Sequence, residues 1–191
     1  MLCLKSDSKI EWVENALENL DQILVDHAHC ERKAATFALS MTTRYPEKVS
    51  MVSKMIEIAL EELEHFQLVH NYIVEKGIEF TKDSGNFFVQ NLHTLISKQV
   101  PMRFLDSLLV GALIEARSCE RFSQLAKHVQ SSELQKFYSD LLASEAGHYT
   151  IYTDIAREYF PKETVKQRLE ELALKEAEIV DLLENTATIH G

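Results

Sequence analysis

Apolar side chains recur along most of the chain every three or four residues, the spacing of amphipathic α-helices. The first stripe begins at Trp12 and continues through Leu20, Leu24 and Ala28. It stops before Pro46, because a proline disfavours helical geometry in the residue that precedes it. The pattern predicts five long helices and one short helix, over residues 8–44, 47–76, 101–129, 132–159 and 162–184, and over residues 86–98.

The lengths of the links between these helices predict the topology. Only a few residues separate the first helix from the second, and the third long helix from the fourth, so each pair should form an antiparallel hairpin. The link over residues 77–100 is long enough to run the length of a bundle. The sequence therefore predicts one all-α domain over residues 1–191: a four-helix bundle with a long crossover and an additional C-terminal helix.

Composition narrows the classes of function. The formal net charge is −10, which argues against indiscriminate nucleic-acid binding and leaves room for a local basic patch. Three cysteines without a CxxC pair favour a reducing, cytoplasmic compartment. The first 12 residues lack the features of a signal peptide, and no run of 18 apolar residues predicts a membrane span.

Acidic residues interrupt the apolar stripe of all four bundle helices. Glu31 follows Leu24 and Ala28 in the first stripe, at a position where an apolar side chain is expected. The second and fourth helices carry a glutamate followed three residues later by a histidine, which places both side chains on one face. Together these in-stripe residues are Glu31, Glu62, His65, Glu115, Glu145 and His148.

The spacing of these residues predicts a metal site. Glu31 and Glu62 are 31 residues apart, and Glu115 and Glu145 are 30 apart, so each hairpin should bring its two acids to a similar depth. Four buried carboxylates without compensation are prohibitively unfavourable. Two divalent cations would compensate them, and carboxylate with imidazole suits iron or manganese. This set of four glutamates and two histidines matches the ferritin-like dimetal template.

Several neighbouring residues are alternatives to this set. A lone glutamate–histidine pair on a helix is weak evidence, and Glu61 and Glu64 lie beside Glu62. The stripe and the three-residue spacing favour Glu62. Glu120 lies about 140° around its helix from Glu115 and breaks the 30-residue spacing. His27, one turn before Glu31, is expected to support a ligand or to pack as a buried polar residue, since six ligands are already present.

Beyond these six residues, several segments of the sequence closely resemble one protein family. "DHAHCERKAA", "EELEHF", "RFLDSLLVGALIEARSCERF" and "SEAGHY" are similar to the tRNA-(2-methylthio-N6-isopentenyladenosine) hydroxylase family, MiaE. The resemblance covers roughly residues 10–185, crossover included. It implies a ferritin-like non-haem diiron monooxygenase that hydroxylates the isopentenyl group of a modified adenosine in tRNA. The implied iron ligands are the six residues above.

The resemblance also implies the other participants in the reaction. They are two iron ions, with manganese not excluded by ligand type, and dioxygen as co-substrate. No flavin or nicotinamide motif occurs, so two electrons should come from an external donor such as a ferredoxin or a reductase.

The surface that would bind tRNA is less defined by the sequence. In the predicted topology one end of the bundle gathers Arg44, Lys48, Lys54, Lys98 and Arg103, which are candidates for a basic patch. An ordinary scatter of solvated cations is the simpler interpretation.

Other residues are further candidates for contact with the RNA. Arg117 with Arg121, and Arg32 with Lys33, are the alternative cations. Phe87 and Phe88 either stack on a base or pack the crossover onto the bundle.

Two further function classes are compatible with the same residues. One is a ferritin-like peroxidase or iron-handling protein without an RNA substrate. The other is a metal-free helical interaction module whose acids face solvent. Metal analysis separates the last class from the first two, and oxygen-dependent modification of tRNA separates a hydroxylase from an iron-handling protein.

Overall fold

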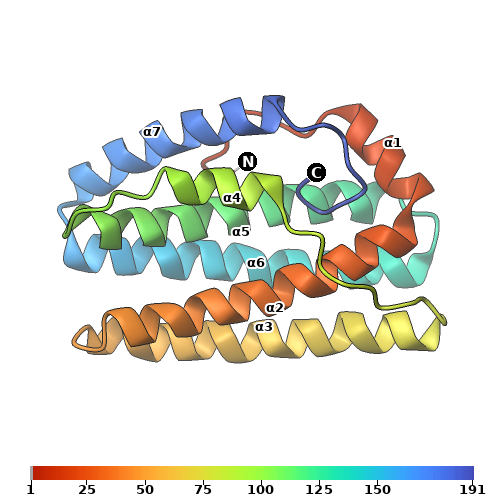
Figure 1. Cartoon of the computed structure of the whole chain (residues 1–191), viewed down its shortest axis with the longest axis horizontal. Helices are drawn as coiled ribbons and strands as arrows, with labels where there is room; N and C mark the ends of the chain where they lie inside the picture. The colour runs from red at the N-terminus through yellow and green to blue at the C-terminus, as the bar shows by residue number, and fades with distance from the viewer. Residues whose placement is uncertain (1) are drawn as a thin grey trace. The chain divides into compact units, whose positions relative to one another are not determined.

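The computed structural model describes residues 2–191, which contain seven α-helices and no strand (Figure 1). The helices are α1 (Ile10–Glu18), α2 (Leu20–Arg44), α3 (Val49–Glu75), α4 (Phe87–Thr94), α5 (Met102–His128), α6 (Ser132–Tyr159) and α7 (Lys162–Asp181). Within residues 2–191, every helix is too short or too polar to span a bilayer. The described chain divides into two compact units, residues 19–85 with 187–189, and residues 2–18, 86–186 and 190–191.

The unit formed mainly by residues 19–85 is built on the antiparallel hairpin of α2 and α3 (Figure 1). The short link closes where Tyr45 N–H donates to the Met41 carbonyl. At the other end, α3 ends at Glu75, and Gly77 just beyond it has a φ of +69°, which suits a residue without a β-carbon. The N–H groups of Gly77 and Ile78 donate to the carbonyls of Val74 and Ile73, the hydrogen-bond pattern of a Schellman cap.

Beyond α3, the first part of the crossover is fastened to α2. Asp83 accepts hydrogen bonds from Arg32 and Lys33, both at 3.2 Å, and from Gly85 N–H at 2.9 Å. The ring of Phe80 stacks on that of His29 with centroids 4.6 Å apart. These contacts hold a loop against the hairpin that carries half of the candidate ligands.

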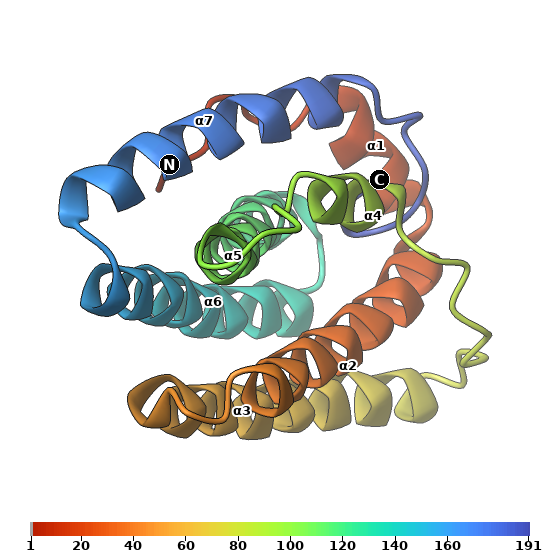
Figure 2. The same cartoon turned by 60° about the vertical axis from the view of Figure 1, so that its left-hand side comes forward.

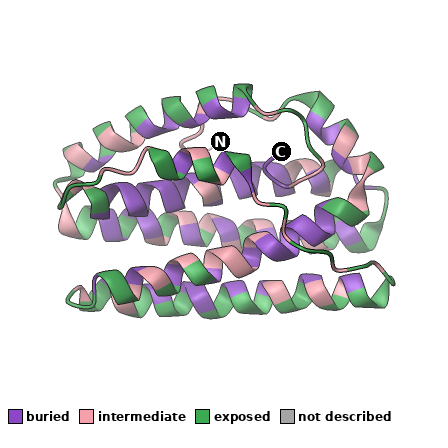
Figure 3. Cartoon of the chain, in the orientation of Figure 1, coloured by how far each residue is buried: buried purple, intermediate pink, exposed green. Residues whose placement is uncertain are grey.

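The other unit surrounds the antiparallel hairpin of α5 and α6 (Figure 2). Helices α1, α4 and α7 all pack against α5. Phe88 and Leu92 of α4 pack with Val110 of α5 and with Ile179 and Val180 of α7. Asn86 caps α4 by accepting a hydrogen bond from Val89 N–H. As a result α5 is buried along nearly its whole length (Figure 3).

A charged network is buried inside this second unit. The Arg117 guanidinium donates to both carboxylate oxygens of Glu176 on α7, at 2.8 and 3.0 Å, and to Glu120 at 3.2 Å. It also donates to the carbonyl of Ser6 in the N-terminal segment. Arg117, Glu120 and Glu176 are fully buried, so the charges require this pairing. The network joins α5, α7 and the N-terminal segment.

The helix boundaries differ from the prediction in one main respect. Where the apolar stripe predicted one helix over residues 8–44, the structure has two, α1 and α2, separated at Asn19. The Asn19 backbone is not helical, and its carbonyl accepts from the N–H groups of Gln22 and Ile23, which begins α2. The apolar periodicity is insensitive to such a break.

Candidate metal centre

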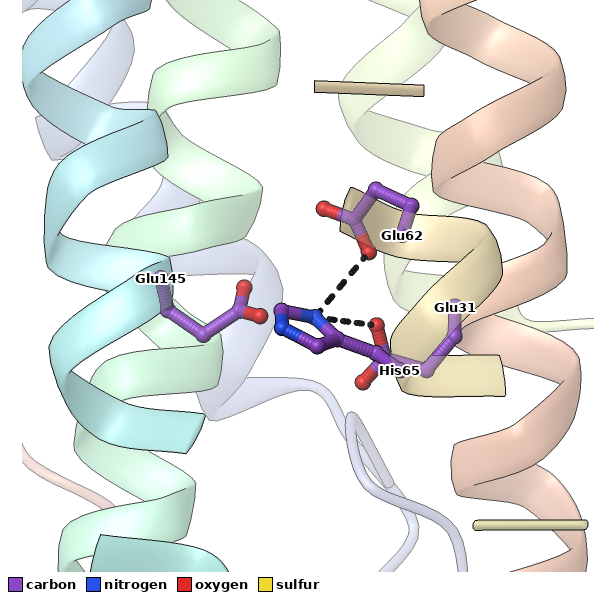
Figure 4. A group of neighbouring side chains, drawn as sticks. All are labelled: Glu31, Glu62, His65 and Glu145. Carbon is purple, nitrogen blue, oxygen red and sulfur yellow. Dashed lines mark ion pairs between the residues drawn. The ribbon is translucent and has the colours of Figure 1, made fainter. Parts of the chain in front are cut away.

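The α2–α3 hairpin brings three candidate ligands together (Figure 4). Glu31 of α2 and Glu62 and His65 of α3 are 3%, 1% and 9% exposed. Each offers a ligand atom, and these atoms lie within 4.8 Å of one another. Nδ1 of His65 is 3.6 Å from Oε2 of Glu31 and 3.8 Å from Oε2 of Glu62. We call these three residues the α2–α3 triad.

His27 supports this triad from one turn earlier on α2. It is completely buried, and its Nε2 lies 2.6 Å from Oε1 of Glu31. A carboxylate only accepts hydrogen bonds, so this contact places the proton on Nε2 of His27. The contact fixes one oxygen of Glu31 and its orientation. A hydrogen bond of this kind typically orients a carboxylate that binds a metal.

The α5–α6 hairpin repeats the arrangement with Glu115 on α5 and Glu145 and His148 on α6. They are 4%, 2% and 1% exposed, and their ligand atoms also lie within 4.8 Å of one another. We call them the α5–α6 triad. Glu145, which Figure 4 also labels, belongs to this second triad. Both hairpins thus deliver one lone glutamate and one glutamate–histidine pair.

One turn before Glu115, a glycine allows α5 and α6 to approach closely. A β-carbon on Gly111 would lie 3.0 Å from Cε1 of the buried Tyr152 on α6. Non-bonded carbon atoms prefer about 3.5–4.0 Å, so the ring occupies the space that a side chain would need. Tyr152 is one turn beyond His148, and this close packing therefore sets the separation of the two helices beside the triad.

Cys30 directly precedes Glu31, Cys119 lies one helical turn after Glu115, and both thiols stay neutral. Burial raises the pKa of Cys119 to about 12, and the negative charge of Glu145 adds to the effect. Burial, and next the charge of Asp26, raise the pKa of Cys30 well above its ordinary value. Thiolate is the form of cysteine that binds metals. The ligand atoms that gather in the two triads are carboxylate oxygens and imidazole nitrogens.

The alternative acids occupy different surroundings. Glu61 and Glu64 are exposed on α3. Glu120 is buried, but Ser8, Arg117 and Gln124 all donate hydrogen bonds to its carboxylate. Burial raises its pKa, yet these hydrogen bonds and the nearby guanidinium groups hold the pKa below its ordinary value overall. Glu120 therefore serves the charged network instead of a triad.

The residues considered for tRNA contact fall into three groups. Of the proposed patch, Arg44, Lys54, Lys98 and Arg103 are exposed and Lys48 is half-buried. The residues before position 60 belong to the unit of residues 19–85, whereas Lys98 and Arg103 belong to the other unit. Arg32 and Lys33 pair with Asp83. Arg117 and Arg121 are 0% and 1% exposed, so they do not offer a surface for RNA.

The two crossover phenylalanines have opposite environments. Phe88 is buried and stacks on His190 with centroids 5.1 Å apart, whereas Phe87 is 56% exposed. Phe88 therefore packs the crossover within its unit, and Phe87 is the one of the two with a ring available to solvent.

Sequence reasoning missed the roles of Gly111, Arg117 and Glu176. Gly111 gave no signal, because a single helical glycine has many causes. Arg117 and Glu176 did give a signal, since both are charged residues at positions that their helices bury. The partner of each charge follows only from the packing of α5 against α7.

The donor set of the two triads fits a pair of divalent cations. Three buried residues in each hairpin present carboxylate oxygens and an imidazole nitrogen, and hard or borderline cations such as Fe²⁺ and Mn²⁺ prefer such ligands. A buried cluster of carboxylates is otherwise strongly disfavoured. This chemistry, on paired helices, is that of the ferritin-like carboxylate metalloproteins.

Known structures define the class of protein. A solved structure described as "Protein 43 with aldehyde deformylating oxygenase activity from Synechococcus" is 38% identical, with a TM-score of 0.95. The match covers 100% of this chain and 96% of that chain. The chain is thus an all-α protein of the ferritin-like class, which confirms the fold class predicted from the sequence.

The family is equally clear. The family model described as tRNA-(MS2IO6A)-hydroxylase (MiaE) matches residues 1–191, and the chain belongs to this family. A relative from Pseudomonas putida, named tRNA 2-(methylsulfanyl)-N(6)-isopentenyladenosine(37) hydroxylase, is 35% identical over 94% of this chain and 87% of its own length. A relative of the same name from Salmonella typhimurium is 27% identical over 88% of this chain and 80% of its own length.

Proposed function

We propose that this chain hydroxylates the isopentenyl group of 2-methylthio-N6-isopentenyladenosine in tRNA. The observation that carries the proposal is membership of the MiaE family over the whole chain, together with the two buried triads. In the reaction one oxygen atom of dioxygen enters a C–H bond of the substrate and the other leaves as water. Two electrons from a ferredoxin or a reductase and two protons from water balance the equation. A substrate in tRNA is consistent with a cytoplasmic enzyme.

The two triads together supply the ligands of two iron ions in this proposal. Glu31, Glu62 and His65 come from one hairpin, and Glu115, Glu145 and His148 come from the other. Four carboxylates balance the four positive charges of two ferrous ions, which leaves the centre near neutral. The bound iron would activate dioxygen, which amino-acid side chains do not do unaided. His27 would hold Glu31 in the orientation that binding requires.

The function is tested with the purified, iron-loaded chain. It is supplied with a reductant, dioxygen and tRNA carrying the isopentenyl modification, and the nucleosides are analysed by mass spectrometry. The expected product is the modified adenosine heavier by one oxygen atom, which carries the label when ¹⁸O₂ is used. Unchanged tRNA in the presence of bound iron and reductant contradicts the proposed substrate.

The ligand set is tested by conservative substitution. Glu62→Gln and Glu145→Gln each remove one carboxylate charge from a different triad, so each should lose bound iron and abolish hydroxylation. Glu61→Gln is the matched control, because Glu61 is the exposed neighbour of Glu62. Iron is counted by elemental analysis, and circular dichroism checks the fold. Full iron content in both triad variants contradicts the assignment.

The basic residues Arg44, Lys48, Lys54, Lys98 and Arg103 are the proposed contacts for the tRNA backbone. Charge reversal of Arg44 and Lys48 should weaken tRNA binding and reduce its salt dependence. Unchanged binding at low salt rejects this surface. Charge reversal at Lys136, which already pairs with Asp140 on α6, provides a control for net charge.

One relative suggests a second candidate activity. The Synechococcus structure is described by aldehyde deformylating oxygenase activity, at 38% identity. Incubation of the same iron-loaded protein with a long-chain aldehyde, reductant and dioxygen measures that activity directly. A ferritin-like peroxidase or iron-handling role would instead give peroxide consumption or iron uptake without a change in tRNA.

A further inference from the structure

A small cavity of about 30 Å³ lies beside the guanidinium group of Arg121 on α5. The start of α1 and the segment that follows α7 supply the rest of its lining, and Figures 1 and 2 show these two parts of the chain side by side. All of the lining residues belong to the unit built on α5 and α6. Those that carry the argument are Lys9, Glu11, Trp12, Arg121, Asn185 and Gly191.

The buried guanidinium of Arg121 has donors that no protein group satisfies. The side chain is 1% exposed, and its Cζ atom lies 3.9 Å from the centroid of the Trp12 ring. Nη2 donates to the carbonyl of Gly191 at 3.1 Å. Nε and Nη1, in contrast, have no hydrogen-bond partner among residues 2–191. A buried donor without a protein acceptor points to a bound water or ion.

The two carboxylates of the buried network are already engaged. Glu120 accepts four hydrogen bonds, two from Ser8 and one each from Arg117 and Gln124, which use the lone pairs of both oxygens. Its Oε2 lies 4.0 Å from Nε of Arg121, beyond hydrogen-bond distance. Both oxygens of Glu176 accept from Arg117. The missing acceptor for Arg121 therefore has to occupy the cavity.

The size of the cavity limits what this acceptor can be. A single water needs about 10–15 Å³ of such space, so the cavity holds two waters or one ion of the size of chloride.

The charges around the cavity favour the ion. Arg121 and Lys9 line it together with one acid, the exposed Glu11. Burial lowers the pKa of Arg121 to about 9, although the charge of Glu120 raises it, so the guanidinium is still charged at pH 7 but incompletely compensated. Water would supply acceptors alone, whereas an anion supplies an acceptor and the missing charge.

We propose that this cavity binds one small monovalent anion of the size of chloride, through Nε and Nη1 of Arg121. Lys9 adds a second positive charge at the edge, where its Nζ donates to the carbonyl of Asp181 at 3.1 Å. Because α1, α5 and the segment after α7 all line the cavity, the bound anion links three parts of the unit. An anion that binds only the folded chain stabilises it. The proposal does not rest on the hydroxylase activity.

Thermal unfolding of the full-length, iron-loaded chain tests the proposal. Sodium chloride is exchanged for sodium methanesulfonate, whose anion is too large for the cavity, at constant ionic strength so that screening is equal. At ten times its dissociation constant, chloride should raise the ratio of folded to unfolded chain about elevenfold. For a chain of this size the melting temperature should rise by about 3–6 °C. Broadening of the chloride NMR line measures binding directly.

Substitutions assign the effect to the cavity. Arg121→Gln should abolish both the chloride-dependent rise in melting temperature and the NMR broadening. Arg157→Gln is the matched control, because Arg157 pairs with Asp154 on the surface and should keep both responses. Lys9→Glu retains Arg121 and changes an exposed residue, and it should weaken chloride binding about tenfold. Circular dichroism checks the fold, and Lys9→Glu decides the outcome where Arg121→Gln does not fold.

Three results would overturn the proposal. Equal melting temperatures of the wild type in chloride and methanesulfonate would mean that water fills the cavity. A chloride response that both Arg121→Gln and Lys9→Glu retain would place the anion elsewhere. Two alanines added after Gly191 should leave the response unchanged. A response that appears only in this extended chain would mean that a carboxylate at Gly191 is the anion.

Discussion

The two hairpins carry the same ligand pattern on helices with very different surroundings. Helix α3 buries the side that holds Glu62 and His65, and several apolar residues are exposed elsewhere on it. Figure 3 shows buried and exposed positions alternating along this helix. Helix α5 holds Glu115 but is buried around its circumference, under α1, α4 and α7. A ligand needs only one face of a helix. The opposite face can therefore pack within its unit in one hairpin and remain exposed in the other.

The residue one turn before each lone glutamate shows a second difference. On α2 this residue is His27, which hydrogen-bonds Glu31. On α5 it is Gly111, which makes room for Tyr152. One hairpin thus orients its lone carboxylate by a direct contact, whereas the other sets the distance between its helices.

Removal of the Arg117 side chain should have the largest effect on stability. Arg117→Met leaves Glu176 buried without its guanidinium partner, which typically costs about 3–5 kcal/mol of unfolding free energy. Urea denaturation followed by circular dichroism measures this loss. Arg157→Met is the control, since Arg157 pairs with Asp154 on the surface and should change stability by less than about 1 kcal/mol. Equal losses in the two variants would falsify the distinction between the buried network and the surface pair.

Loss of the His27 imidazole should lower the affinity for metal while the chain still folds. His27→Ala removes the group that orients Glu31, and substitutions of this kind typically lower metal affinity about 10–100-fold. Competition with a chelator measures the affinity for ferrous iron. His29→Ala provides the control, because His29 is also buried on α2 but donates to the carbonyl of Thr81. Equal iron affinity in the two variants contradicts the role given to His27.

Two glycines of the α5–α6 hairpin should respond in opposite directions to alanine. Gly111→Ala forces a β-carbon against Tyr152, at about 1–3 kcal/mol, and recovers about 1 kcal/mol of helix propensity. We expect a net destabilisation of about 1 kcal/mol. Gly147→Ala has no atom within 4 Å of the new carbon, so it should stabilise by up to about 1 kcal/mol. Thermal unfolding distinguishes the two signs, and the same sign for both would contradict the close packing at Gly111.

Loss of the contacts that Asp83 makes between the crossover and α2 should have the smallest effect on stability, and that effect should depend on pH. Burial raises the pKa of Asp83, but the Gly85 N–H and Lys33 lower it by more, so the folded value lies below the ordinary 3.8. A lowered pKa stabilises the fold above the ordinary value, and this contribution is lost as the pH falls through the folded value.

Substitution at Asp83 isolates that contribution. Asp83→Asn should cost about 0.5–1 kcal/mol at pH 7, discounted for the solvent-exposed part of the pair. The difference from wild type should shrink below about pH 4. Urea denaturation at both pH values measures it, and a difference that stays constant from pH 7 to pH 3 contradicts the ion pair.

Much of the fold was predictable because apolar periodicity follows directly from helix geometry. The two hairpins, the long crossover and the boundaries of α6 all follow from stripes, short links and caps such as Ser131, which accepts from Leu134 N–H. The break at Asn19 was not predictable in this way, since the stripe continues through it. Periodicity reports which face of a segment is buried and is insensitive to a local change of direction.

The sequence alone determined which residues are candidate ligands. Six polar residues at positions that their helices bury require compensation, and their spacing within each hairpin follows from 3.6 residues per turn. Only the tertiary structure decided what surrounds them. It paired Glu120 with Ser8 and Arg117 and placed Tyr152 in the space at Gly111, whereas the sequence had already offered His27 as the support of a ligand. These contacts join residues that are distant in the chain or chosen among several neighbours, and packing selects among them in a way that local periodicity does not encode.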